Sequence, residues 1–81
     1  MLEPGGRAKL PIAIAHEALR RLLREARANP AANWRLGVSR GIETALHGPA
    51  AGALAALETR LGRRIAIAVE PGRADFDIAA V

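Results

Sequence analysis

Hydrophobic positions in the last third of the chain change from a helical spacing to a strand spacing. Leucines at i, i+3 and i+7 share one helical face within residues 53–61, and Gly62 follows where a left-handed C-cap is expected. Residues 65–69 alternate between β-branched and smaller or polar positions, which is typical of a strand with one buried face. After a Pro-Gly turn signal, residues 76–78 repeat the alternation. The pattern predicts a helix, a strand, a turn and a second short strand.

A longer helical pattern precedes this unit. Pro11 suits the first turn of a helix, where its missing N–H is not needed. Apolar residues then recur at three-to-four spacing and form a core stripe of Ile12, Ala15, Leu19, Leu22, Leu23 and Ala26. Asn29-Pro30 ends the pattern, so we expect a helix from Pro11 to about Ala28.

The middle of the chain predicts one strand and two further helices. Residues 34–38 alternate as a short strand does. Ser39 is a good N-cap for a helix over residues 40–47. Pro49 is expected to start the next helix, which runs to Leu61.

The resulting order, α-β-α-α-β-β, predicts an α/β (α+β) fold in a single small domain. Strands one and two are joined by helices, so they are expected to be parallel, whereas a short turn makes strands two and three antiparallel. A three-stranded mixed sheet with helices packed on one face follows. At 81 residues there is room for one core only; residues 11–81 are assigned to the domain and residues 1–10 to a linker remnant.

Composition removes several function classes. The chain has no cysteine, which excludes disulfides and thiolate metal sites, and its two histidines are far apart in sequence. Asp75 and Asp77 fit the polar face of a half-buried strand better than a cation site, and Ser39 has no base near it in sequence. We therefore assign no catalytic residue and no metal ligand. No apolar run reaches the ~18–20 residues that span a bilayer, so a cytoplasmic protein with no membrane contact is expected.

The chain has a net charge of +4, and nearly all of its positively charged side chains are arginines. This charge allows two interpretations. A phosphate-facing surface would use it to bind RNA, whereas an alanine- and arginine-rich composition also places arginine on ordinary solvated helix faces. The candidates for RNA contact are Arg20, Arg24, Arg27, Arg63 and Arg64. Trp34, the single tryptophan, is either an interface anchor or part of the edge of the core.

Four segments, taken in order, carry features of one known family. They are AHEALRRLLREARANP, NWRLGVSRGIETALHG, LAALETRLGRRIAIAVEP and FDIAAV. They contain an A-x-E-A-L-R helix, a strand followed by a small-residue helix entry, a Leu-Gly-Arg helix end, and a strand closing in Glu-Pro before Phe-Asp-Ile. Over about residues 11–81 this ordered set resembles the C-terminal small domain of bacterial ribonuclease E/G proteins.

The resemblance implies part of a single-strand-specific endoribonuclease that processes and degrades RNA in the cytoplasm. In that family, cleavage depends on magnesium held by aspartates in a separate nuclease domain, and an S1 domain grips the RNA. The small domain contributes packing and homo-oligomer contacts. The matching stretch holds no catalytic residue, so this chain alone is not expected to cleave RNA; its implied partners are further copies or the rest of the nuclease.

Two departures from the family pattern are present. Many relatives carry a Cys-Pro-x-Cys zinc link before the first helix, where this chain has residues 2–7, LEPGGR, without the zinc ligands. Arg40-Gly41 replaces the usual proline after the first-strand serine.

A rival interpretation from another class is a stand-alone RNA-binding module that uses the arginine face. A third is an interaction domain that self-associates through a sheet edge or through Trp34.

Overall fold

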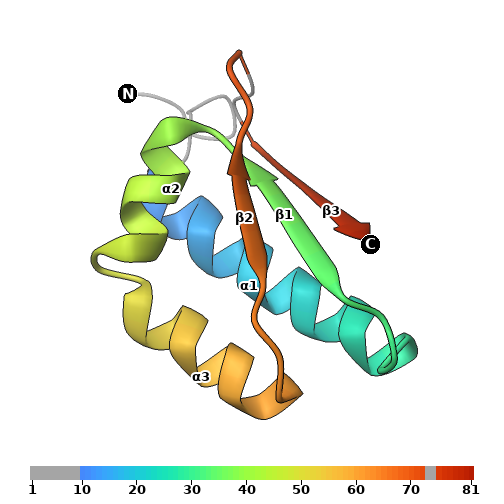
Figure 1. Cartoon of the computed structure of the whole chain (residues 1–81). Coiled ribbons are helices and arrows are strands. Elements are labelled where there is room, and N and C mark those ends of the chain that lie inside the picture. The colour runs from blue at the N-terminus through green and yellow to red at the C-terminus, as the bar shows by residue number, and fades with distance from the viewer. Residues whose placement is uncertain (1–9, 73–74) are drawn as a thin grey trace.

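A computed structural model describes residues 10–72 and 75–81 of the chain (Figure 1). The elements are α1 Pro11–Ala28, β1 Trp34–Val38, α2 Arg40–His47, α3 Ala51–Leu61, β2 Ala66–Val69 and β3 Phe76–Ala80. The predicted order of helices and strands is confirmed, and α1 has the predicted bounds. Apart from Leu10, the linker assigned to residues 1–10 lies outside the described residues.

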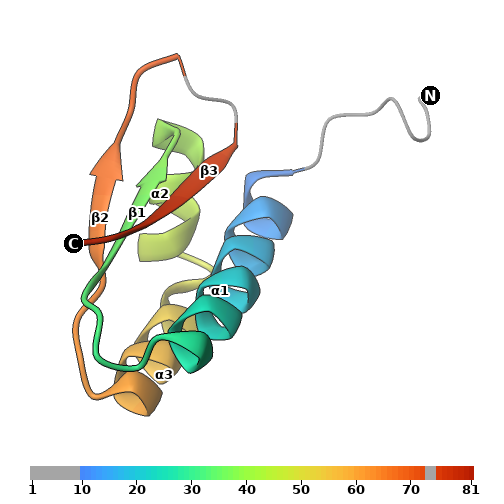
Figure 2. The ribbon, with the colours of Figure 1, turned by 90° about the vertical axis from the view of Figure 1, so that its right-hand side faces the viewer.

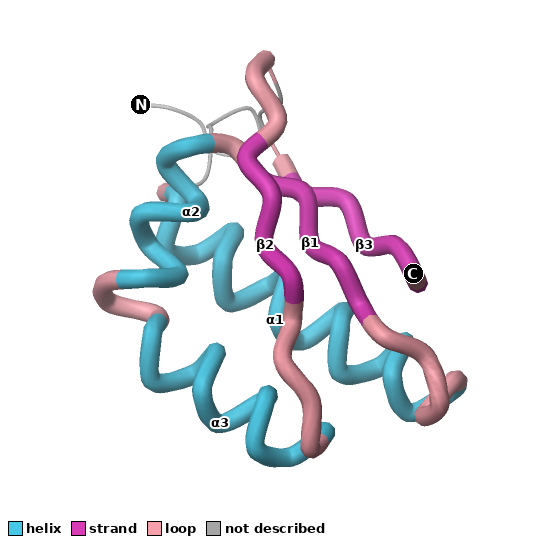
Figure 3. Tube along the Cα trace, in the orientation of Figure 1, coloured by secondary structure: helices cyan, strands magenta, loops and turns pink. Residues whose placement is uncertain are grey.

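The three strands form one mixed sheet in which β1 is the central strand (Figure 3). It pairs with β2 in parallel, with Leu36 opposite Ile67, and with β3 in antiparallel, with Leu36 opposite Ile78. Viewed edge-on, all three helices lie on the same side of this sheet (Figure 2). The predicted parallel pair, the mixed sheet and the one-sided helical layer are therefore confirmed.

The relation between β2 and β3 differs from the one the short turn suggests. The two strands run in opposite directions, as expected, but they do not pair with each other, because β1 lies between them. The ladder to β1 continues past β2, where the Glu70 N–H donates to the Val38 carbonyl at 2.8 Å. Since every apolar side chain of β1 is buried whereas those of β2 and β3 are only partly so, the central position goes to the strand with the most surface to bury.

The start of α3 is a second correction. The helix begins at Ala51 instead of Pro49, since residues 48–50 form a turn. In this turn the Ala50 N–H donates to the Ala45 carbonyl at 2.8 Å, and the Ala51 N–H donates to the Gly48 carbonyl at 3.0 Å. Ala50 is buried there, so the turn contributes to the core instead of extending the helix.

Two predicted caps hold the ends of helices. The Ser39 hydroxyl accepts a hydrogen bond from the Ile42 N–H at 3.3 Å and starts α2. Gly62 ends α3 in the left-handed region at φ 70°. The Arg63 N–H then donates to the Glu58 carbonyl at 3.2 Å, the pattern of a Schellman motif.

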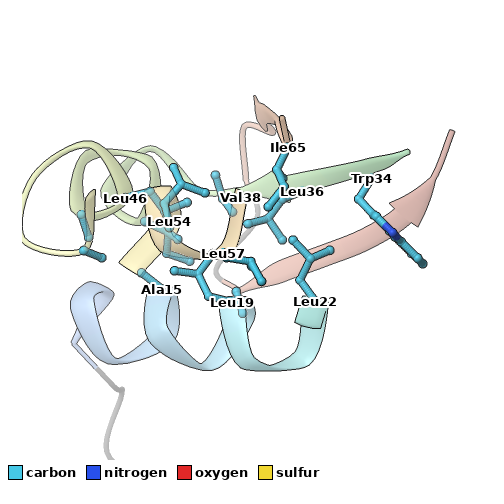
Figure 4. Packing of buried hydrophobic residues seen from close by; sticks show 14 of the residues in the cluster. Ala15, Leu19, Leu22, Trp34, Leu36, Val38, Leu46, Leu54, Leu57 and Ile65 are labelled. Carbon is cyan, nitrogen blue, oxygen red and sulfur yellow. The ribbon is translucent and has the colours of Figure 1, made fainter. Parts of the chain in front are cut away.

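The core lies between the helices and the covered face of the sheet (Figure 4). Its largest fully buried side chains are Leu22, Leu36, Val38, Ile42 and Leu46. They come from α1, β1 and α2, which makes β1 the strand around which the helical layer is packed.

Candidate functional site

The five arginines predicted to contact RNA lie on two segments of the structure. Arg20, Arg24 and Arg27 are exposed along α1, where their spacing keeps them on one side of the helix. Arg63 and Arg64 are exposed just after α3 and line a separate hollow at the end of that helix. The set therefore divides into a ridge on α1 and a pair beyond α3.

A groove between α1 and α3 brings one predicted arginine next to one that sequence reasoning missed. The two helices lie side by side in the helical layer (Figure 2), and the groove between them has a volume of about 250 Å³. Its lining consists of His16, Leu19, Arg20, Leu23, Ala53, Ala56, Leu57 and Arg60. Arg60 was missed because its proximity to Arg20 depends on how α3 packs against α1, and no local pattern reports that packing.

Among the residues that the structure describes, no acidic side chain pairs with the arginines on the rim of this groove. Along α1, the neighbours of Arg20 at i−4 and i+4 are His16 and Arg24; along α3, those of Arg60 are Ala56 and Arg64. None of them is acidic, and Glu17, at i−3 of Arg20, lines a different hollow with Arg21. The described part of the chain offers neither Arg20 nor Arg60 an ion pair. We refer to these eight lining residues as the α1/α3 groove: an apolar floor with a basic rim.

Two hydrogen bonds near the end of α3 give Arg63 and Glu58 structural roles. The Arg63 guanidinium donates to Asn33 Oδ1 at 2.7 Å, which ties the end of α3 to the start of β1. The carboxylate of Glu58 accepts the Ile65 N–H at 2.8 Å, which ties α3 to the start of β2. Neither contact was expected from the sequence, because both join residues that only the folded chain brings together.

Of the two aromatic residues, Trp34 is buried and Phe76 is partly buried. Trp34 is 7% exposed and lies at one end of the core cluster (Figure 4), so little of its surface is left for a partner. Its role as an interface anchor stays a prediction. Phe76 is partly buried, with the guanidinium of Arg21 5.7 Å from the centre of its ring.

The face of the sheet away from the helices is uncovered and carries small side chains. Strand alternation and the strand register place on it the residues Arg35, Gly37, Ala66, Ala68, Asp77 and Ala79. The Glu70 carboxylate lies over Gly37, where an added Cβ would come within 2.7 Å of it. Glu70 also pairs with Arg35 at 3.7 Å. We refer to these six residues as the open sheet face.

Residues 10–72 and 75–81 contain no group of three or more His, Asp or Glu side chains placed to hold a metal ion, and the whole chain lacks cysteine. Asp77 lies exposed on the open sheet face. Of the helices that the structure describes, none has both the length and the apolar character required to cross a bilayer.

Comparison with known proteins gives no family assignment: no protein-family model matches the chain, and neither does any curated protein sequence.

Proposed function

We propose that this chain is the C-terminal small domain of a ribonuclease E/G-type endoribonuclease that acts in RNA processing and decay in the cytoplasm. In this proposal it is a structural and oligomerisation domain without a catalytic centre of its own. The resemblance supports the proposal, since its four segments occur in the family's order, and the helices and strands expected of them follow in that order along the chain.

The open sheet face is the observation that carries the structural role. All-parallel sheets are usually covered on both faces, whereas a mixed sheet can leave one face open to solvent or to a partner. Here the parallel pair β1–β2 is covered on one face only. The other face carries the small side chains Ala66, Ala68 and Ala79, over which a second layer can approach, beside Gly37, which the Glu70 carboxylate covers. Another unit that covered that face would add a third layer and bury its alanine side chains.

Two measurements test the proposal: the association of the chain with itself or with the rest of the nuclease, and the cleavage of single-stranded RNA. We expect the chain to self-associate in sedimentation equilibrium or, if monomeric, to bind the nuclease and S1 portion of a ribonuclease E/G protein. We expect no cleavage of single-stranded RNA with magnesium. A monomer that binds neither itself nor that portion, or cleavage that is lost on mutating a residue of this chain, would contradict the proposal.

A matched pair of variants assigns the association to the open sheet face. Ala66→Glu and Ala79→Glu each place a carboxylate opposite Arg35, where a cross-strand pair with opposite charges is tolerated, so the fold is retained. The bulk and charge should abolish docking on that face. Ala55→Glu, on the exposed side of α3, is the control and should leave association unchanged.

A second candidate function is RNA binding by the α1 ridge of Arg20, Arg24 and Arg27. The exposed side chains favour it, but neither aromatic residue of the chain is placed to stack on a base, so the contact would involve phosphates only. It predicts weak affinity that falls steeply with salt. Filter binding with oligouridine at low salt tests it: replacing the three arginines by glutamine should remove the binding, and the absence of binding by the unmodified chain would exclude it.

A further inference from the structure

The α1/α3 groove combines the two features that recognise an amphipathic segment: an apolar floor and charged edges of a single sign. Leu19 and Leu57 are buried at its base, with Leu23 and the small side chains of Ala53 and Ala56 beside them. Alanines at i and i+3 on α3 leave the groove hollow where larger residues would fill it. The floor therefore offers apolar surface that an incoming side chain can cover.

The rim decides the charge of the occupant. Arg20 stands on the α1 side and Arg60 on the α3 side, with His16 completing the lining. Within the part of the chain that the structure describes, Arg20 and Arg60 form no ion pair, and the nearest carboxylate on α3, Glu58, accepts the backbone N–H of Ile65. A partner that supplies carboxylates on both sides of an apolar stripe would meet a complementary surface.

The size of the groove favours a segment of a protein over an enclosed small molecule. Its volume of about 250 Å³ lies below the ~300–1,000 Å³ typical of pockets that enclose drug-sized ligands. Two helices side by side form the kind of groove in which a third helix places apolar residues at i, i+3, i+4 and i+7. A second copy docked groove to groove is disfavoured, since a two-fold contact would bring two arginine rims together.

We propose that the α1/α3 groove binds an acidic amphipathic helix of a partner protein, with leucine-like anchors on its floor and glutamate or aspartate against Arg20 and Arg60. This goes beyond the structural role of the open sheet face, which lies on the other side of the sheet. The two surfaces are therefore tested separately.

The experiment is fluorescence anisotropy of the full chain with two labelled synthetic peptides. Both carry leucines at i, i+3, i+4 and i+7; one has glutamates flanking the stripe and the other has lysines. The glutamate peptide should bind with an affinity that falls as salt rises, and the lysine peptide should bind at least about tenfold more weakly, because like charges replace attractive contacts.

Three variants locate the binding. Replacing Arg20 and Arg60 by glutamate should weaken the glutamate peptide about tenfold and strengthen the lysine peptide. Ala56→Leu, at an exposed position, should fill the groove and weaken both peptides while the fold is kept. Arg40→Glu, a single charge reversal on α2 away from the groove, is the control and should leave both affinities unchanged.

Several outcomes would overturn the proposal. One is failure of the glutamate peptide to bind at low salt; another is binding that the double arginine variant leaves intact. If single-stranded oligonucleotides bind and lose affinity in that variant while the glutamate peptide does not bind, the groove is an RNA surface. If Ala56→Leu dissociates an oligomer of the chain, the occupant is a second copy.

Discussion

Removing the carboxylate of Glu58 should destabilise the domain far more than its position on a helix surface suggests. Glu58 is partly buried near the end of α3, and its carboxylate accepts the backbone N–H of Ile65 at 2.8 Å. Ile65 immediately precedes β2 and is 6% exposed. The Ile65 N–H therefore has little access to water, and Glu58→Ala removes the acceptor that satisfies it.

The size of the effect follows from the type of hydrogen bond. A bond to a charged group contributes about 1.5–3 kcal/mol, and an unsatisfied buried donor costs about 1–3 kcal/mol. The gain in helix propensity from alanine offsets only a few tenths of a kcal/mol. We expect Glu58→Ala to lower the free energy of unfolding by about 1–3 kcal/mol, which in a domain of this size lowers Tm by roughly 5–20 °C.

Urea unfolding followed by the fluorescence of Trp34, the single and buried tryptophan, measures this change. Glu58→Gln keeps an amide oxygen as acceptor and should lose about half as much stability. Glu25→Ala is the matched control, an exposed Glu-to-Ala change in α1, and should change stability by less than about 0.5 kcal/mol. Equal losses for Glu58→Ala and Glu25→Ala would refute the assignment of Glu58 as the acceptor that anchors β2.

The same unfolding measurement checks three further predictions. Ser39→Ala should lower the free energy of unfolding by about 0.5–1 kcal/mol, in the lower part of the range for N-caps, because its hydrogen bond is long at 3.3 Å. An unchanged unfolding midpoint would contradict the capping role of Ser39. Gly62→Ala should cost about 1–2 kcal/mol for a left-handed alanine, whereas Gly52→Ala in the exposed part of α3 should stabilise by about 0.5 kcal/mol; equal signs would contradict this backbone argument. Leu22→Ala, at a fully buried position, should cost about 2–5 kcal/mol, a large share of the stability of a small domain.

The elements that the sequence predicted well are those whose ends are set by local chemistry. Pro11 at the start and Asn29-Pro30 at the end define α1, Ser39 caps α2, and Gly62 takes the left-handed conformation at which the chain leaves α3 toward β2. In each case one residue type suits one backbone geometry, so the neighbouring residues suffice for the prediction.

The order of the strands and the groove could not be obtained in this way. A short connection between β2 and β3 suggested that they are neighbours, but the gain from burying Trp34, Leu36 and Val38 places β1 between them. Arg60 meets the same groove as Arg20 only through the packing of α3 on α1. The strand order and the position of Arg60 depend on the free energy of the whole fold, which cannot be inferred from any short stretch of the sequence.

The open sheet face and the α1/α3 groove differ in charge, and this difference makes their partners separable. Arg35 on the open sheet face pairs with Glu70, which leaves Asp77 as the other charged residue of that face, so two copies of it bring together little net charge. The rim of the groove has no such compensation among the described residues, and the sheet separates it from the open face. Ala79→Glu should therefore reduce association without changing the affinity for the glutamate peptide. The double Arg20 and Arg60 reversal should do the opposite, and a variant of one surface that abolished both functions would show that they are a single site.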